Sequence, residues 1–409
     1  MKRKLVVVGA GMASGRLLEQ LFDASRDSYD VTLFGAEPRG NYNRIMLSPV
    51  LAGETTYGEI VTHDSDWYVA HGVACRFGET VTNINRATRT VHSRNGETPY
   101  DKLVLATGSA PFIIPIAGKE LQGVLSFRDL DDVNAMLAVA EKPGAHAVVL
   151  GGGLLGLEAA AGLKARGMQV VVLHLMGHLM ERQLDPAAGL LLQKELEGRG
   201  IAIHCRAQTT AILGHKRAEA VLLDDGTIYP ADLVVMATGI RPETRVATDA
   251  GLHVERGIVV DDQMRTSDPD ILAAGECVEH AGVCYGLVDP IYNMAAVAAR
   301  TLLGEAASFR SVEIGTHLKV TGVNVSSAGD FLGAAGTESV TLSDRGLKSY
   351  KKLVIKDGRL VGAVLFGDSA DGLWYQELIR SGASIEAMRD DIVFGRALAE
   401  RSMTKKLAA

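Results

Sequence analysis

Cysteine, long apolar runs and clusters of basic residues are all scarce in this 409-residue sequence. It has only four cysteines, too few and too scattered for a disulfide scaffold: Cys75, Cys205, Cys277 and Cys284. No stretch approaches the ~20 apolar residues that a membrane-spanning helix needs, so we expect a cytoplasmic protein without a membrane segment. The 42 basic and 49 acidic residues give a net charge of −7 without a basic patch, which argues against a nucleic-acid partner.

Glycine, by contrast, is abundant at 45 residues, and two segments use it in the same way. Each segment consists of an apolar strand, a glycine turn, a helix and a second strand. These parts occupy 4–8, 9–14, 15–22 and 31–34 in the first segment, and 147–150, 151–156, 157–166 and 169–173 in the second. Continuous β-branched runs are typical of parallel strands buried on both faces. The sequence therefore predicts an α/β protein with two Rossmann-like dinucleotide-binding units, each around a parallel central sheet.

The repetition extends to the end of each half. Residues 100–108 and 231–239 both read as an aspartate, an apolar strand and then Ala-Thr-Gly. A strand that ends in a glycine turn lets the backbone pass close to a bound cofactor. We therefore expect Thr107 and Gly108 near the first cofactor, and Thr238 and Gly239 near the second.

The first glycine turn predicts an FAD site. Gly9, Gly11 and Ser14 form a slightly altered GxGxxG motif, in which Ser14 replaces the third glycine but is small enough for helix–strand packing. Gly11 lets a pyrophosphate reach the helix N-terminus. Glu37 follows the second strand, where an acid hydrogen-bonds a ribose. The plainer alternative is a tight turn with a surface glutamate, and the duplicated context favours the cofactor.

The second turn, Gly151, Gly153 and Gly156, is a complete motif and predicts a nicotinamide-nucleotide site. Its second strand ends at His174, where an acid would select NAD and a nearby arginine would select NADP. Because no cation is clearly placed for a 2′-phosphate, NADH is favoured and NADPH stays possible. His174 has the plainer alternative of ending a strand.

Two such cofactors in one chain indicate hydride transfer from nicotinamide to flavin, which needs no catalytic acid or base from the protein. The segment 40–49 contains no cysteine, so no thiol relay is expected. Cys277, His280 and Cys284 have a spacing that could bind a metal, but a fourth ligand is not obvious, so we expect no metal site.

From about residue 315 the pattern changes to a small α+β domain. Alternating strands are predicted over 318–323, 349–356 and 360–366, with a turn at Asp357-Gly358, and helices over 374–380 and 385–390. The basic tail 396–406 reads as a solvated helix, with partner docking as the alternative.

These residues together resemble the FAD-dependent pyridine nucleotide oxidoreductases. The chain looks most like the flavin module of the NADH-dependent nitrite reductase large subunit, and like electron-transfer subunits of assimilatory nitrate reductase. The segments that carry the resemblance are 42–48 with 51–54, 174–188, 257–269, 275–280 with 285–288, and 362–368 with 370–375.

The resemblance implies an FAD domain over 1–110 and 241–314, an NAD(P) domain over 111–240, and a C-terminal α+β interface domain over 315–409. It also implies that Arg44, Thr107, Gly108, Gly275 and Glu276 lie at the FAD. It places Glu158 beside the nicotinamide and makes His174 ordinary for this branch.

The chain has no cysteine after Cys284, so we do not expect these residues to contain the iron–sulfur domain of the nitrite reductase large subunit. We therefore expect electrons to pass to a separate nitrate or nitrite reductase partner with an iron–sulfur centre. The alternative enzyme is a rubredoxin- or ferredoxin-type NAD(P)H reductase, against which Pro49 counts because a lysine often stands there in that subgroup. A redox-sensing module and an oxygen-reducing oxidase are further alternatives.

Overall fold

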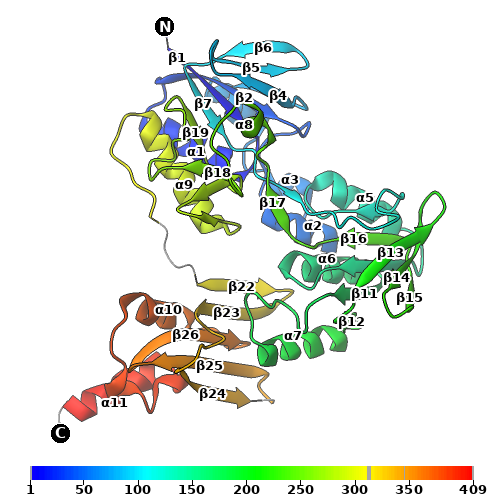
Figure 1. Cartoon of the computed structure of the whole chain (residues 1–409), viewed down its shortest axis with the longest axis vertical. Coiled ribbons are helices and arrows are strands. Elements are labelled where there is room, and N and C mark those ends of the chain that lie inside the picture. Colours follow the sequence, from blue (N-terminus) through cyan, green and yellow to red (C-terminus); the bar gives the residue numbers. More distant parts are fainter. Residues whose placement is uncertain (1, 311–314, 345, 408–409) are drawn as a thin grey trace. The chain divides into compact units, whose positions relative to one another are not determined.

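A computed structural model describes residues 2–310, 315–344 and 346–407 of the chain (Figure 1). The chain forms two compact units. The first comprises Met1–Phe112, Arg128–Leu130 and Ile240–Ser311, and the second comprises Ile113–Phe127, Asp131–Gly239 and Val312–Ala409. Each unit is thus assembled from segments that are far apart in the sequence.

The first unit is built around a parallel sheet with strand order β19-β7-β1-β2-β3. Its strands are β1 (Arg3–Val8), β2 (Tyr29–Gly35), β3 (Ala74–Phe77), β7 (Lys102–Leu105) and β19 (Ile271–Ala273). The apolar run Leu5–Val8 is buried, as the continuous β-branched pattern predicts for a strand covered on both faces.

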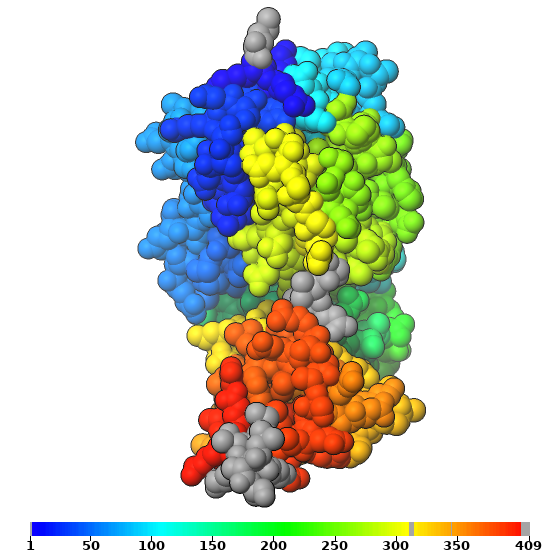
Figure 2. Space-filling model, turned by 90° about the vertical axis from the view of Figure 1, so that its left-hand side faces the viewer, coloured from blue at the N-terminus to red at the C-terminus, as the bar shows by residue number. Residues whose placement is uncertain are grey.

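Helices α1 (Met12–Ala24) and α9 (Val288–Leu302) belong to this unit and lie side by side, as both views show (Figures 1 and 2). Each buries one apolar stripe, which includes Leu17 and Leu21 of α1 and Met294 of α9. The shorter helices are η1 (Arg44–Met46), α2 (Leu47–Ala52), α3 (Tyr57–Ile60), α4 (Ser65–Ala70) and α8 (Arg245–Asp249).

Small antiparallel and mixed sheets complete the first unit. They contain β4 (Val81–Asn85), β5 (Thr90–Ser93) and β6 (Gly96–Pro99); β8 (Ser109–Pro111) with β17 (Ile240–Pro242); and β18 (Ile258–Val260), β20 (Val278–His280) and β21 (Val283–Cys284).

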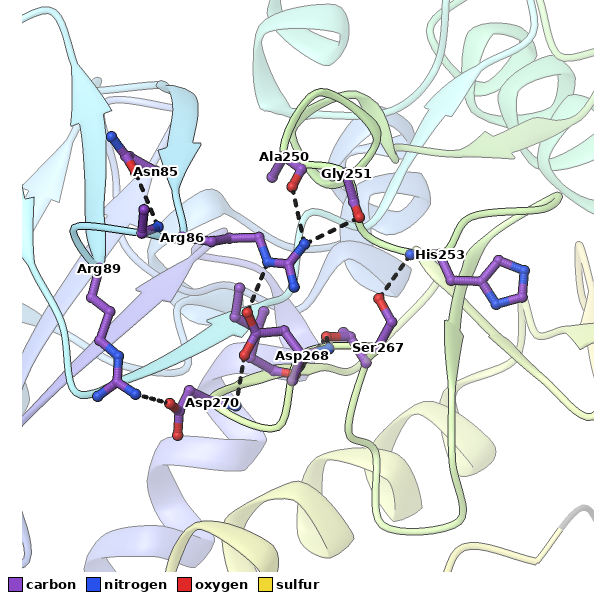
Figure 3. Close-up of polar contacts among 12 residues, drawn as sticks. Asn85, Arg86, Arg89, Ala250, Gly251, His253, Ser267, Asp268 and Asp270 are labelled. Atoms are coloured by element: carbon purple, nitrogen blue, oxygen red, sulfur yellow. Dashed lines mark hydrogen bonds and ion pairs between the residues drawn. The ribbon is translucent and has the colours of Figure 1, made fainter.

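A polar cluster connects the β4–β5 turn to the segment just before β19 (Figure 3). Arg86 donates to Asp268 over 2.8 Å and to the carbonyl oxygens of Ala250 and Gly251, and Arg89 pairs with Asp270. These bonds position β19, the strand that precedes Gly275 in the chain.

The second unit contains a parallel sheet of the same design, with order β12-β11-β10-β16-β9. Its strands are β9 (Val124–Leu125), β10 (His146–Leu150), β11 (Gln169–His174), β12 (Ala202–Cys205) and β16 (Leu233–Met236), and its helices are α5 (Leu130–Ala140), α6 (Leu154–Ala165) and α7 (Pro186–Gly198). One face packs on an antiparallel sheet of β13 (Thr209–Gly214), β14 (Ala218–Leu223) and β15 (Ile228–Pro230). The predicted α/β fold with a duplicated βαβ unit is confirmed.

The C-terminal part of the second unit is an antiparallel sheet with order β22-β23-β26-β25-β24. Its elements are β22 (Thr316–Val320), β23 (Val323–Gly329), β24 (Glu338–Asp344), β25 (Ser349–Lys356), β26 (Arg359–Phe366), α10 (Gly372–Ser381), η2 (Glu386–Met388), η3 (Ile392–Phe394) and α11 (Arg396–Leu407). The predicted α+β character is confirmed, as is the turn at Asp357-Gly358, where both residues have positive φ.

Two local predictions for this part were wrong. The single strand over 318–323 is divided by a turn at Thr321-Gly322, where φ is 45° and 90°, so it belongs to two strands. The helix over 385–390 is only the 3₁₀ turn η2. Both errors arise because short apolar alternations give no signal for where a chain reverses.

Candidate functional site

The first glycine of each motif lies directly against the strand end of its own half. Gly9 has φ of 109°, and a Cβ there would stand 2.1 Å from the carbonyl oxygen of Ala106. Gly151 has φ of 120°, and a Cβ there would stand 2.2 Å from the carbonyl oxygen of Ala237. The repeated Ala-Thr-Gly segments therefore pack under the two turns, which explains why both features are duplicated.

The packing of the protein does not require a glycine at the second position of either motif. A Cβ on Gly11 or Gly153 would meet no atom within 4 Å. These residues are the N-caps of α1 and α6, and neither helix has a side-chain capping bond at that end. An open cradle at an uncapped helix N-terminus fits a pyrophosphate, whose oxygens the backbone N–H groups would bind.

The third positions differ between the halves. A Cβ on Gly156 would stand 2.1 Å from the Gly151 carbonyl oxygen, so glycine is required there. Ser14 is fully buried, and its hydroxyl donates to the Gly11 carbonyl oxygen over 2.8 Å. The Asn41 amide donates to Ser14 over 3.1 Å and to the Gly11 carbonyl, and Tyr68 bonds Asn41 in turn. Asn41 was not predicted, because no sequence motif marks it.

Glu37 lies just beyond β2, at the centre of a group of donors. Its carboxylate accepts from the Tyr42 hydroxyl over 2.8 Å, from Arg39 over 3.3 Å and from Arg44. Burial raises the pKa of Tyr42, so the hydroxyl stays protonated and donates. The Arg44 guanidinium also donates to the carbonyl oxygen of Arg128 over 3.1 Å, so Glu37 and Arg44 occupy one site.

Glu276 lies at the end of the same sheet, after β19. It accepts from Arg128 over 2.6 Å and from Ser109 over 2.7 Å. Arg128 thus connects the Glu37–Arg44 pair to Glu276, and no sequence motif marks Arg128. The Thr107 hydroxyl donates to the Glu243 carbonyl oxygen over 2.6 Å, and Gly108 and Gly275 both have positive φ.

The nicotinamide-site candidates gather at the ends of β10, β11 and β16. His174 is buried at the end of β11, where Nδ1 bonds the Gly152 backbone N–H over 3.0 Å and Nε2 lies 3.2 Å from Glu181. Glu158 is half-buried in α6, just after Gly156. Thr238 and Gly239 follow β16, with φ of 115° at Gly239.

The cysteines do not assemble into a redox or metal centre. All four are free thiols, and burial raises the pKa of each of them, that of Cys75 to about 11. Cys277 bonds backbone carbonyls, whereas His280 bonds Asp262 over 2.9 Å. Within the described residues, no group of three or more His, Cys, Asp or Glu side chains is arranged to hold a metal ion.

Comparison with known proteins extends these observations. A model of the pyridine nucleotide-disulphide oxidoreductase family matches residues 3–301, and a model of the rubredoxin NAD+ reductase C-terminal domain matches residues 315–383. The solved NADH:rubredoxin oxidoreductase from Clostridium acetobutylicum is 25% identical with a TM-score of 0.80, covering 94% of this chain and 97% of that one. Over 2–310, 315–344 and 346–407, no helix is long and apolar enough to cross a bilayer.

Two curated relatives come from Bacillus subtilis (strain 168). Its nitrite reductase (NAD(P)H) is 47% identical over 386 residues, 94% of this chain and 48% of that protein. Its assimilatory nitrate reductase electron transfer subunit is 41% identical over 372 residues, 90% of this chain and 48% of that protein. The chain therefore spans about half the length of these two relatives.

Proposed function

The chain belongs to the pyridine nucleotide-disulphide oxidoreductase family, and on that premise we propose that it passes electrons from NADH through FAD to the iron–sulfur centre of a separate nitrate or nitrite reductase protein. It is an NAD(P)H-dependent flavin oxidoreductase. The observation that carries the proposal is the pair of open glycine cradles, one in each half of the duplicated fold.

The chain's own groups have distinct tasks in this proposal. At the FAD, Gly9, Gly11 and Ser14 shape the pyrophosphate cradle, and the carboxylate of Glu37 accepts from ribose hydroxyls. Arg44, Thr107, Gly108, Gly275 and Glu276 line the rest of the flavin site, between 1–110 and 241–314. Bound here, FAD would supply an acceptor for the hydride of NADH and a carrier able to pass electrons on one at a time.

At the nicotinamide nucleotide, Gly151, Gly153 and Gly156 shape the second cradle within 111–240. His174, Glu158, Thr238 and Gly239 surround it, and no residue is needed as a catalytic acid or base. The C-terminal α+β part, 315–409, supplies the interface domain, which we propose contacts the redox partner. The two cofactors are FAD and NADH.

The choice of partner is supported by the relatives. One is named a nitrite reductase and another an electron transfer subunit of assimilatory nitrate reductase, and both extend to about twice this chain's matched length. These names support a nitrate or nitrite reductase as the acceptor of electrons from the flavin. A redox protein partner also agrees with the rubredoxin reductase model that matches 315–383.

That match favours one alternative, a reductase that serves rubredoxin or a small ferredoxin. The similarity to the rubredoxin oxidoreductase of Clostridium acetobutylicum extends over 94% of the chain and supports the same alternative. Pro49 argues against this alternative, because it lies in the first turn of α2, where that subgroup often has lysine. The identity of the acceptor therefore requires a direct comparison.

The test is an anaerobic titration of the flavin-loaded protein with NADH, followed by flavin absorbance, and then reoxidation by candidate acceptors. We expect NADH to bleach the flavin and a nitrate or nitrite reductase protein with an iron–sulfur centre to restore the colour much faster than oxygen does. Faster reoxidation by rubredoxin or a ferredoxin would establish the alternative. A flavin that NADH leaves oxidised would contradict both.

A further inference from the structure

The end of β11 lacks an acid where the first half of the chain has Glu37. Backbone bonds from Gly9 to Phe34, 2.8 Å, and from Gly151 to Leu173, 2.9 Å, set the two halves in the same register. Counting onward from these bonds, Met176 stands at the level of Glu37. In dinucleotide folds a carboxylate near this strand end accepts from the adenosine 2′-hydroxyl, whereas an arginine there receives the 2′-phosphate of NADP.

A carboxylate nevertheless reaches this strand end from the following loop. Glu181 Oε2 lies 3.2 Å from His174 Nε2, and His174 Nδ1 lies 3.0 Å from the Gly152 backbone nitrogen. Because a backbone N–H can only donate, Nδ1 is the acceptor, and the proton on Nε2 points to Glu181. His174 therefore joins the glycine turn to the Glu181 carboxylate.

The backbone fixes the same loop from the other side. The Met180 N–H donates to the Gly152 carbonyl oxygen over 3.0 Å, so Gly152 is bonded through its N–H to the last residue of β11 and through its carbonyl to the loop that follows. Met180 is fully buried and has φ of 52°. A non-glycine residue rarely adopts this left-handed backbone conformation unless the surrounding structure holds it there. Glu181 comes next, with 26% of its side chain exposed, so the carboxylate is both held and accessible to a ligand.

Arg206 is the competing group. It follows β12, its side chain is exposed, and its Nε would lie 3.6 Å from a Cβ on Gly177. Its backbone N–H donates to the Met176 carbonyl oxygen over 3.0 Å, so Arg206 also lies beside this loop. The Glu181 carboxylate is held by the buried His174 side chain, whereas the Arg206 side chain is exposed. This difference in how the two groups are held favours recognition by the carboxylate.

We propose that Glu181, oriented by His174, binds the adenosine ribose of NADH and excludes the 2′-phosphate of NADPH. The inference rests on the proposed function, because it requires a nicotinamide nucleotide at the second glycine turn. The carboxylate accepts a hydrogen bond from a free 2′-hydroxyl and repels a phosphate at the same place. Glu181 is then a specificity-determining residue and His174 a positioning residue.

The test uses calorimetric titration of the FAD-loaded protein with ADP and with 2′-phospho-ADP. The two differ only in the 2′-phosphate and carry no nicotinamide, so they report binding independently of electron transfer. We expect the wild-type protein to bind ADP ~10-fold or more tightly than 2′-phospho-ADP, and Glu181→Gln to bring the two affinities close together. Glu219→Gln, which neutralises an exposed acid on β14 of the same unit, should leave the preference unchanged.

The His174→Asn variant distinguishes two roles of His174, the orientation of Glu181 and the support of the glycine turn at Gly152. The shorter amide can still accept from Gly152 but cannot reach Glu181, so we expect it to reduce the preference for ADP while FAD stays bound. An unchanged preference in Glu181→Gln and His174→Asn would overturn the inference and leave the proposed function intact. A wild-type preference for 2′-phospho-ADP that Arg206→Gln abolishes would also overturn it, whereas no binding of either nucleotide would contradict the proposed function itself.

Discussion

At the scale of single residues, the two glycine motifs contain glycines of different kinds. Gly9 and Gly151 are required by the fold, because their φ angles are positive and a Cβ would collide with a backbone carbonyl. Gly11 and Gly153 are not required by the fold, because a Cβ at either position would stand in open space. A requirement for glycine at the second pair would therefore come from the ligand.

This distinction predicts a reciprocal pair of variants. Gly11→Ala should lower FAD affinity by ~10-fold or more, and Gly153→Ala should do the same to NADH affinity while FAD stays bound, because each methyl group blocks the approach of a pyrophosphate. Flavin retention on gel filtration and the NADH concentration needed for half-bleaching measure the two effects.

The control for this pair is the stability of the apoprotein. Both glycines have backbone angles that alanine adopts, so we expect unfolding in urea within about 1 kcal/mol of wild type. Gly9→Ala should instead lose several kcal/mol, on the order of 3, through strain and collision. If Gly11→Ala kept full FAD affinity, the assignment of its cradle would be wrong.

At the scale of elements, ion pairs beside β7 and β19 hold these two strands, whose ends lead to the residues proposed to bind FAD. Asp270 precedes β19 and pairs with Lys102 at the start of β7, over 2.8 Å, and with Arg89 of the β4–β5 turn (Figure 3). The hydrogen bond from Lys102 holds the pKa of Asp270 below its ordinary value of 3.8, although burial opposes this. Because the folded-state pKa is the lower one, the stabilisation is complete above the ordinary value and is lost as the pH falls through the folded-state value.

We therefore expect Asp270→Asn to lower the free energy of unfolding by about 1 kcal/mol near neutral pH, with the difference from wild type shrinking below about pH 4. Urea unfolding of the flavin-loaded protein, followed at several pH values, measures this difference. Asp23→Asn, an exposed aspartate in α1, serves as the control and should show no comparable difference. If the difference in unfolding free energy between wild type and Asp270→Asn stayed constant with pH, the charge of Asp270 would contribute nothing to stability.

At the scale of the whole molecule, we expect electron flow in this chain not to depend on its thiols, although the family is named for disulphide chemistry. All four cysteines are free, and their pKa values are raised by burial. At neutral pH they are protonated and poorly nucleophilic. The path from nicotinamide to acceptor is therefore expected to use the flavin alone.

Treatment with iodoacetamide near neutral pH should leave about nine-tenths or more of the NADH-dependent reduction of an artificial acceptor intact. Mass spectrometry of the treated protein shows which cysteines were modified. It therefore distinguishes cysteines that do not react from cysteines whose modification leaves the activity unchanged. Loss of activity in step with modification of a single cysteine would place a thiol on the electron path and contradict the expectation.

Part of the site could be predicted because its signals are local. The glycine motifs, the Ala-Thr-Gly repeats and the apolar strand runs are each contained in a few consecutive residues, and the resemblance to the flavin oxidoreductases added Arg44 and Glu276. Asn41, Arg128 and Glu181 could not be found in this way. Asn41 and Arg128 contact site residues that are distant in the chain, as when Arg128 bonds Glu276. Glu181 reaches His174 across the loop after β11, whose path no motif predicts.

Short residue patterns were enough to predict the α/β class and the duplicated unit with its two glycine turns, because strand burial and turn conformation follow from neighbouring residues. Longer segments carried the resemblance to the family. Only the folded chain showed which side chains complete each turn, how Ser14 is accommodated in place of a glycine, and where the 318–323 segment reverses. The first two depend on contacts between residues far apart in the chain, such as Ser14 with Asn41, and no local pattern encodes such a contact.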